Sequence, residues 1–330
     1  MDQSIYAIRY LSAEGGYALR TMNILNTLAP VFLIVALGAL LKRARFISSQ
    51  EVTGLNRLVY WVGLPCLLFF EITTASYDFH AAGSTFLVVL AGLIVSLAVS
   101  YSFARLLNIS PSAVGTFVQG SFRGNLMYIG LPIILYGSYN EPAYSAVKNI
   151  ALLVLAITVP VYNIVAVVVL LASQHRIDRR LPAKIFAQLV TNPVVIATIA
   201  AFLFSAIFEG LPLSISRTFE AVGQIALPLA LLGIGGTLAE GSIARKRLLA
   251  LAASLIKVFI APAFGFLFAL LFFLNPDQTR IALVYLACPA ATVTYVFAEQ
   301  LEGDASLAAE IVLISTLLSI ASLAAVLAIC

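Results

Sequence analysis

Arg123 and Asn125 are the residues whose types and setting best suit binding chemistry. They belong to the stretch QGSFRGNLMYIGLPIILYG, residues 119–137, inside a hydrophobic run long enough to cross a bilayer. A guanidinium can hold a carboxylate through two parallel hydrogen bonds, and a side-chain amide can donate another. Because an arginine at this depth costs about 2.5–3.5 kcal/mol on insertion scales, its side chain must face protein or water. The pair predicts a site for a small anion.

The same stretch is built to interrupt a helix. Gly120, Gly124, Gly130 and Pro132 weaken the helical hydrogen-bond ladder, and a continuous lipid-facing helix would not carry them together. A break would free backbone N–H groups and turn the positive end of the following half-helix toward the site. We therefore expect a broken membrane helix, with Gly124, Gly130 and Pro132 at the break.

Two alternatives stay open for this pair of residues. Arg123 could instead form a permanent ion pair with an acidic residue of another span, for which the candidates are Glu71, Glu299 and Glu310. Asn125 could cap the broken helix without touching a ligand.

Lys257 is a second cation inside a predicted span. It could bind the anion and balance its charge, or it could donate to carbonyls that a broken helix sets free. The alternative is snorkelling, in which the long side chain reaches toward the interface.

A second proline-broken stretch, LACPAATVTY, occupies residues 286–295. Its small residues would let another span cross closely at Cys288 and Pro289, where Cys288 is expected to be a packing residue. Thr292 and Tyr295 offer hydroxyls near the break and are candidate substrate contacts. A threonine in a membrane helix, however, often bonds only to its own preceding turn.

The composition sets the class of protein. The chain has 62% hydrophobic and 10% charged residues, against roughly 45–50% and 25% in soluble domains. At roughly 20 residues per crossing, it predicts an all-α membrane protein with ten spans. We expect them at 24–41, 54–70, 85–106, 112–136, 143–172, 184–208, 215–238, 248–274, 280–298 and 306–329.

Basic residues predict the orientation. Most Lys and Arg lie in the loops after the odd-numbered spans, among them Lys42, Arg43, Arg45, Arg176, Arg179, Arg180, Lys184, Arg245, Lys246 and Arg247. The positive-inside rule then places both termini outside, in the periplasm or its equivalent. We expect the protein in the cell inner (plasma) membrane. The loop after span nine, 299–304, contains no Lys or Arg.

Two halves of five spans repeat one pattern. Leu64-Pro65 in span two resembles Leu227-Pro228 in span seven, and Pro132 in span four matches Pro289 in span nine at a similar offset. Because five is odd, the second half must be inverted, as in secondary transporters with a site at the midplane. Prolines that recur by chance are the simpler alternative.

Other classes of function lack their signatures. No phosphate-binding loop or HExxH motif is present, all five aspartates fall in terminal or loop positions, and the three cysteines and two histidines are scattered. We expect no enzyme activity, no cofactor and no metal site. The basic loops follow membrane topology, so we expect no nucleic-acid partner.

Three segments form a recognisable combination: GSFRGN with the following GLP, the LNRLVY run that leads to Leu64-Pro65, and CPAATVTYVFAEQLEGD, residues 288–304. In these segments the chain resembles the auxin efflux carrier family, in its bacterial form. This resemblance implies ten helices in two inverted five-helix repeats, similar to bile-acid/sodium symporters, with the broken helices four and nine crossing beside the substrate. Asn125, Pro132 and Pro289 map onto that crossover. The resemblance also implies a homodimer through helices two and seven.

These observations predict a secondary transporter for a small organic anion, such as malonate or another mono- or dicarboxylate, that works by alternating access. The resemblance favours export. The alternatives are a sodium-coupled organic anion symporter and a membrane protein without transport activity. We expect a first repeat at 22–173, a short cytoplasmic linker at 174–183 and a second repeat at 184–330. Residues 1–21 form an N-terminal extension, and translation could begin at Met22.

Overall fold

The computed structural model describes residues 24–74, 78–139, 141–173, 183, 186–187, 190–208, 210–240 and 246–330. Within this part the chain is helical, and its only β-type pairing is an isolated bridge. Among the described residues, seven helices are long and apolar enough to cross a membrane. The prediction of an all-α, multi-pass membrane protein is confirmed. The predicted extension 1–21 and nearly all of the predicted linker lie outside the described residues.

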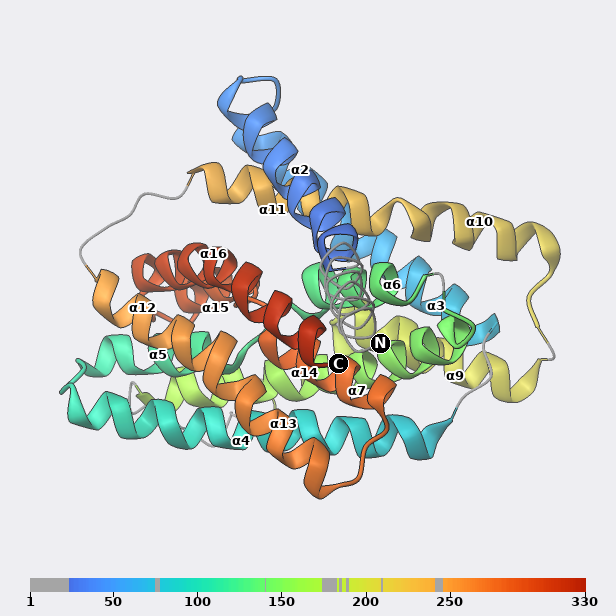
Figure 1. Ribbon diagram of the computed structural model, residues 1–330. Coiled ribbons are helices and arrows are strands. Elements are labelled where there is room, and N and C mark those ends of the chain that lie inside the picture. The colour runs from blue at the N-terminus through green and yellow to red at the C-terminus, as the bar shows by residue number, and fades with distance from the viewer. Residues whose placement is uncertain are drawn as a thin grey trace, which may run out of the picture.

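Figure 1 shows the helices coloured in chain order, from the N-terminal helices in blue to α16 in red. The first helix is Ile24–Arg43. It is followed by α2 (Ser49–Leu58), η1 (Val59–Gly63), α3 (Leu64–Thr74), α4 (Phe79–Leu106), α5 (Pro111–Phe122), η2 (Leu126–Gly130), α6 (Leu131–Ser138), α7 (Tyr144–Ser173), α9 (Pro193–Ile207), α10 (Leu213–Gln224), α11 (Ala226–Glu240), α12 (Arg247–Leu255), η3 (Ile256–Ile260), α13 (Ala261–Leu271), α14 (Pro276–Ala287), α15 (Val293–Gln300) and α16 (Ala305–Ile329).

Three of the predicted spans are not single long helices. The fourth is divided between α5 and η2–α6, and the ninth between α14 and α15. The predicted start of the sixth, at residue 184, lies outside the described residues; the described residues 183, 186–187 and 190 are helical, and the span is interrupted at 191–192 before α9 begins at Pro193. Asn192 caps this helix by accepting hydrogen bonds from the amides of Val194 (3.0 Å) and Val195 (3.4 Å). An Asn-Pro pair is a helix-start signal that the hydrophobicity of the segment obscured.

Each π-helical segment is caused by a proline just beyond it. Pro65, Pro132 and Pro262 have no amide hydrogen, and each ring would collide with the carbonyl four residues earlier. The helix widens there, so that the amide of Leu64 donates to Val59 O and that of Leu131 donates to Leu126 O, five residues back. The η3 segment repeats the pattern before Pro262. Such bulges are frequent at functional sites, and η1 and η2 here line the cavity described below.

Glycines of α11 let this helix pack closely on the first helix and α2. A Cβ added to Gly235 would lie 1.9 Å from Val35 O, and one added to Gly38 would lie 2.2 Å from Leu232 O. This is the close packing expected of small residues between membrane helices. The glycines of span seven therefore serve contacts within the chain.

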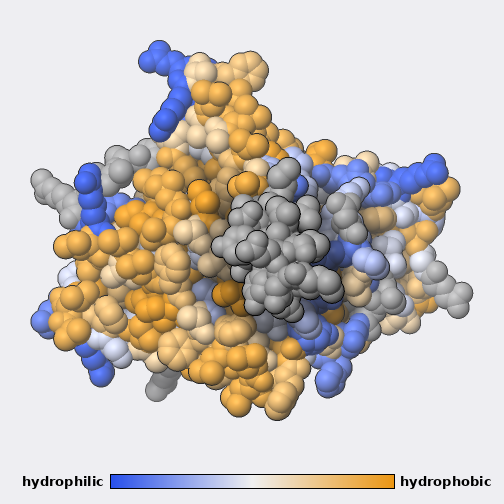
Figure 2. Space-filling model, viewed as in Figure 1, coloured by the Kyte–Doolittle hydropathy of each residue, from blue (hydrophilic) through white to orange (hydrophobic). Residues whose placement is uncertain are grey.

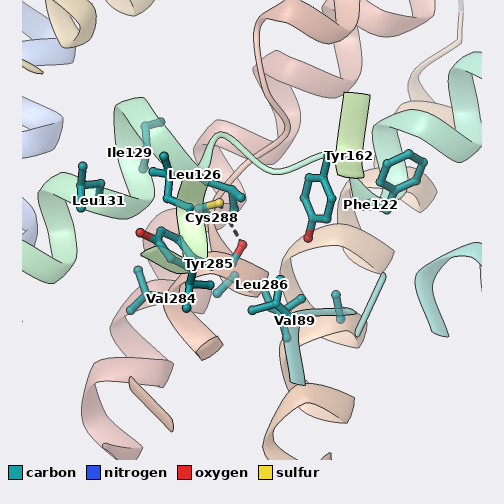
Figure 3. Close-up of a cluster of buried hydrophobic side chains, with 14 of the residues drawn as sticks. Val89, Phe122, Leu126, Ile129, Leu131, Tyr162, Val284, Tyr285, Leu286 and Cys288 are labelled. Carbon is teal, nitrogen blue, oxygen red and sulfur yellow. Dashed lines mark hydrogen bonds between the residues drawn. The ribbon is translucent and has the colours of Figure 1, made fainter. Parts of the chain in front are cut away.

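The buried core gathers around the broken helices. Figure 3 shows Cys288 beside Leu126 and Tyr285, with the Phe122–Tyr162 ring pair close by. The hydroxyl of Tyr285 donates to Ala151 O (2.8 Å), so α14 is also fixed to α7 by a polar contact. On the outside, apolar side chains cover most of the face seen in Figure 2, with hydrophilic residues gathered toward its ends, as expected for a bilayer environment.

Candidate functional site

The two broken helices pair with each other through their backbones. The Asn125 amide donates to Pro289 O (2.7 Å), and the Ala291 amide donates to Arg123 O (2.9 Å). Gly124 and Ala290 thereby form an antiparallel bridge. Non-helical backbone inside a membrane must find partners within the protein, and here each break supplies them to the other.

Gly124 makes this close approach feasible. A Cβ at this position would lie 2.9 Å from Cys288 Sγ and 3.0 Å from Lys257 Cε. Gly130 is similarly confined, because a Cβ there would lie 2.8 Å from Tyr285 Cδ1. The predicted break residues Gly124, Cys288 and Pro289 therefore meet at one point, and Gly130 and Pro132 belong to the helix that leaves it.

A cavity of about 1280 Å³ extends from the paired breaks to one end of the helix bundle. Its floor contains Arg123, Asn125 and Thr292. Its other end is bounded by the beginnings of α2 and α16 and by the end of α11, where Thr53, Ser306 and Thr237 lie. These helix ends adjoin Lys42 and Arg43 at the end of the first helix, Arg45 in the following turn, and Lys246 at the start of α12. The cavity therefore opens toward the basic side of the protein.

Arg123 is buried at the inner end of this cavity, with 3% of its surface exposed. Its guanidinium donates to Asn163 Oδ1 and to Gln119 Oε1 (3.4 Å). The Phe297 ring lies beneath it, with its centroid 3.9 Å from Cζ, a cation–π contact. These partners are neutral, so they orient the guanidinium without cancelling its charge.

The predicted alternative of a permanent ion pair finds no support among the residues that the structure describes. Glu71 pairs instead with Lys148 (2.8 Å). Glu310 is buried on α16, but its carboxylate oxygens have no hydrogen-bond partner in the described chain. Arg123 makes no ion pair with a described carboxylate, which leaves its charge available to a ligand.

Asn125 has the geometry for both roles that the sequence left open. Its Oδ1 accepts a hydrogen bond from the Tyr128 amide (3.2 Å) and so caps η2. Because the oxygen is engaged, the NH₂ group is the part that remains to donate into the cavity that Asn125 lines.

The other predicted substrate contacts divide into two groups. Thr292 and Tyr295 line the cavity, as the N-cap and an early residue of α15. Lys257 does not line it. Its ammonium lies beyond the crossover and donates to Leu286 O.

Several residues that line the cavity or hold Arg123 were not predicted from the sequence. Asn163 on α7 and Gln119 on α5 position the arginine, and Tyr60, Trp61 and Tyr162 contribute aromatic walls. The available signal was the presence of Asn163 in the middle of a 30-residue apolar helix, because a polar side chain at this depth marks a functional or structural partner.

The described part of the chain is thus a helical, multi-pass membrane protein with a one-sided cavity that ends on paired broken helices. A family model described as "Membrane transport protein" matches residues 23–327. The chain belongs to this family, and the resemblance to auxin efflux carriers is confirmed. A protein of Rhizobium meliloti (strain 1021) described as "Putative malonate transporter" is 24% identical over 319 residues, which cover 91% of this chain and 93% of the relative.

Proposed function

We propose that this membrane transport protein is a secondary transporter that moves a small mono- or dicarboxylate by alternating access. The observation that carries the proposal is the buried guanidinium of Arg123, held by neutral partners at the inner end of a one-sided cavity. A carboxylate bound there would supply the missing negative charge. The description of the Rhizobium meliloti relative makes malonate the first substrate to test.

In this proposal Arg123 binds a carboxylate oxygen pair and Asn125 donates a further hydrogen bond. The amide groups that begin η2 and α15 border the same space and add the positive ends of two helix dipoles. Thr292 and Tyr295 would contact the rest of the anion.

We further infer that residues 22–173 and 184–330 are inverted repeats and that the crossover moves against the other helices. The similar interruptions of α5–α6 and α14–α15, and their antiparallel pairing, support this arrangement. If the basic loops are cytoplasmic, the structure corresponds to an inward-open state and both termini are periplasmic. The test is a C-terminal fusion to a reporter that is active only in the cytoplasm. Activity of this reporter in cells would contradict the proposed orientation.

Three further parts of the proposal follow the family resemblance. The inner membrane is the proposed location, and the second and seventh helices, α2–α3 and α10–α11, are the proposed dimer contact. Light scattering of the purified protein that detects only monomers would exclude the dimer. Export is the proposed direction.

The decisive experiment is a thermal-shift screen of purified protein against malonate and other mono- and dicarboxylates. A ligand at 100 times its Kd stabilises the native state by about 2.7 kcal/mol. We expect one carboxylate class to raise the Tm of the wild type and to have no effect on Arg123→Gln.

Arg57→Gln is the matched control because Arg57 lines the same cavity but is exposed near its mouth. This variant should retain the ligand shift. If Arg123→Gln responds to the carboxylate as strongly as the wild type does, Arg123 is not the anchor. If no anion stabilises the wild type, the substrate is not an organic anion.

A further inference from the structure

The end of α14 exposes carbonyl groups that the interrupted helix cannot satisfy by itself. Donors from elsewhere in the protein reach two of them. Leu286 O accepts a hydrogen bond from the Lys257 ammonium, and Ala287 O accepts one from Ser322 Oγ (3.1 Å). A third carbonyl, Tyr285 O, accepts a contact from Cys288 Sγ (3.1 Å), which Figure 3 marks. The helix end is therefore closed by side chains rather than left open.

The ammonium is the unusual member of this set. Lys257 is fully buried, with 0% of its surface exposed, and it reaches the site from η3, where Pro262 has widened the helix. Its Cε lies 3.0 Å from the position that a Cβ of Gly124 would occupy. The cation thus lies directly beneath the point where the two broken helices cross.

Burial of an ammonium is costly unless its surroundings favour a positive charge. Here the carbonyl end of the 12-residue helix α14 supplies the negative end of a helix dipole as well as a direct acceptor. Freed carbonyls and helix C-terminal ends are also what binds Na⁺ in transporters with broken helices. Lys257 therefore satisfies, from within the chain, the groups that a metal cation would otherwise bind.

We propose that Lys257 is the resident cation of the crossover and takes the place of a coupling metal ion, so that transport does not require Na⁺. This inference rests on the proposed function, since it concerns how the same transporter is driven. It separates this chain from a sodium-coupled symporter on the basis of one residue. The side chain stays with the crossover throughout the cycle, whereas a bound metal ion would be released with the substrate.

The first test measures malonate uptake by the full-length protein in liposomes, in sodium chloride and in choline chloride of equal ionic strength. We expect equal uptake by the wild type in both salts and loss of uptake in Lys257→Met, which keeps the length of the side chain but removes its charge. Lys42→Met is the control, because Lys42 is a lysine at the exposed end of the first helix.

A second measurement does not depend on malonate being the substrate. Thermal unfolding in the same two salts should show no Na⁺-specific stabilisation of the wild type. Lys257→Ala removes the ammonium and leaves room, so we expect sodium or ethylammonium ions to stabilise this variant where they do not stabilise the wild type.

The outcomes separate the two proposals. Uptake by the wild type that requires Na⁺, or Lys257→Met activity equal to the wild type in choline, overturns the role of Lys257 but leaves the transporter intact. Absence of uptake and of any carboxylate thermal shift refutes the proposed function. In that case, Na⁺-specific stabilisation of the wild type would overturn the proposed role of Lys257 as well. If Na⁺ does not stabilise the wild type but sodium or ethylammonium ions stabilise Lys257→Ala, the role of Lys257 is supported.

Discussion

Replacing Gly124 by alanine tests whether the crossover is as closely packed as the structure indicates. The added methyl group would meet three neighbours at once: Cys288 Sγ at 2.9 Å, Lys257 Cε at 3.0 Å and Leu126 Cδ2 at 3.2 Å. These atoms belong to three different segments, so no single rotation makes room. Overpacking of this kind costs about 1–3 kcal/mol.

Part of that cost is offset because alanine restricts the unfolded chain, which contributes about 0.4–1 kcal/mol of stability. We therefore expect Gly124→Ala to lower the free energy of unfolding by about 0.5–2 kcal/mol. Gly83→Ala is the matched control. Gly83 lies within α4, where an added Cβ would have no neighbour within 4 Å, and alanine there should stabilise the helix by up to about 1 kcal/mol.

The assay is thermal unfolding of the two purified variants in one detergent, followed by tryptophan emission. The chain has a single tryptophan, Trp61, in η1 at the cavity wall, so the signal reports on the region of interest. Equal melting temperatures for Gly124→Ala and Gly83→Ala would refute the close crossing of the two breaks.

Two further predictions concern ion pairs at the end of the bundle opposite the cavity opening. Glu71 of α3 and Lys148 of α7 are 2.8 Å apart and mostly buried. We expect a double-mutant cycle of Glu71→Gln and Lys148→Met to give a coupling energy of about 0.5–3 kcal/mol. Additive effects of the two substitutions on the free energy of unfolding would show that the pair does not hold these helices together. Hydrogen bonds from Arg280 (2.7 and 2.8 Å) lower the pKa of Glu141 in the folded state, so its stabilising contribution is present above the unfolded pKa of about 4.3 and is lost as the pH falls through the folded value. The difference in Tm between the wild type and Glu141→Gln should therefore shrink below about pH 4, and a difference that stays constant down to pH 3 would contradict the assignment.

The sequence carries enough information to locate the breaks but not what satisfies them. Gly124 and Pro289 weaken their helices by their own chemistry, so the interruptions are predictable from residue type. The partner of Lys257 is a backbone carbonyl 29 positions away. Because every residue has a backbone carbonyl, the residue types do not indicate which one accepts this hydrogen bond. Residue type alone is therefore compatible with several roles for this lysine.

The same limit applies to the surroundings of Arg123. A buried arginine requires polar or charged partners, and the sequence offered acidic residues as candidates. The structure uses the amides of Asn163 and Gln119 and the ring of Phe297 instead. A buried amide such as Asn163 signals that it has a partner but does not say which one, so only the three-dimensional arrangement identifies Arg123 as that partner. The interruption before α9 was not predicted because the Asn192-Pro193 pair lies inside an apolar segment.

The pairing of distant breaks also has a consequence for biogenesis. Arg123 obtains Gln119 and Asn163 from the first half of the chain, but the backbone of its own break pairs with Pro289 and Ala291, which leave the ribosome much later. We expect the arginine to be tolerated at the translocon before synthesis ends. The peptide groups around Gly124, however, have no hydrogen-bond partners until the second half of the chain is made. A chain that ends at residue 173 should then insert into the membrane but be degraded rapidly, and co-expression of residues 184–330 should protect it. If the first half is equally long-lived alone, its open break needs no partner during assembly.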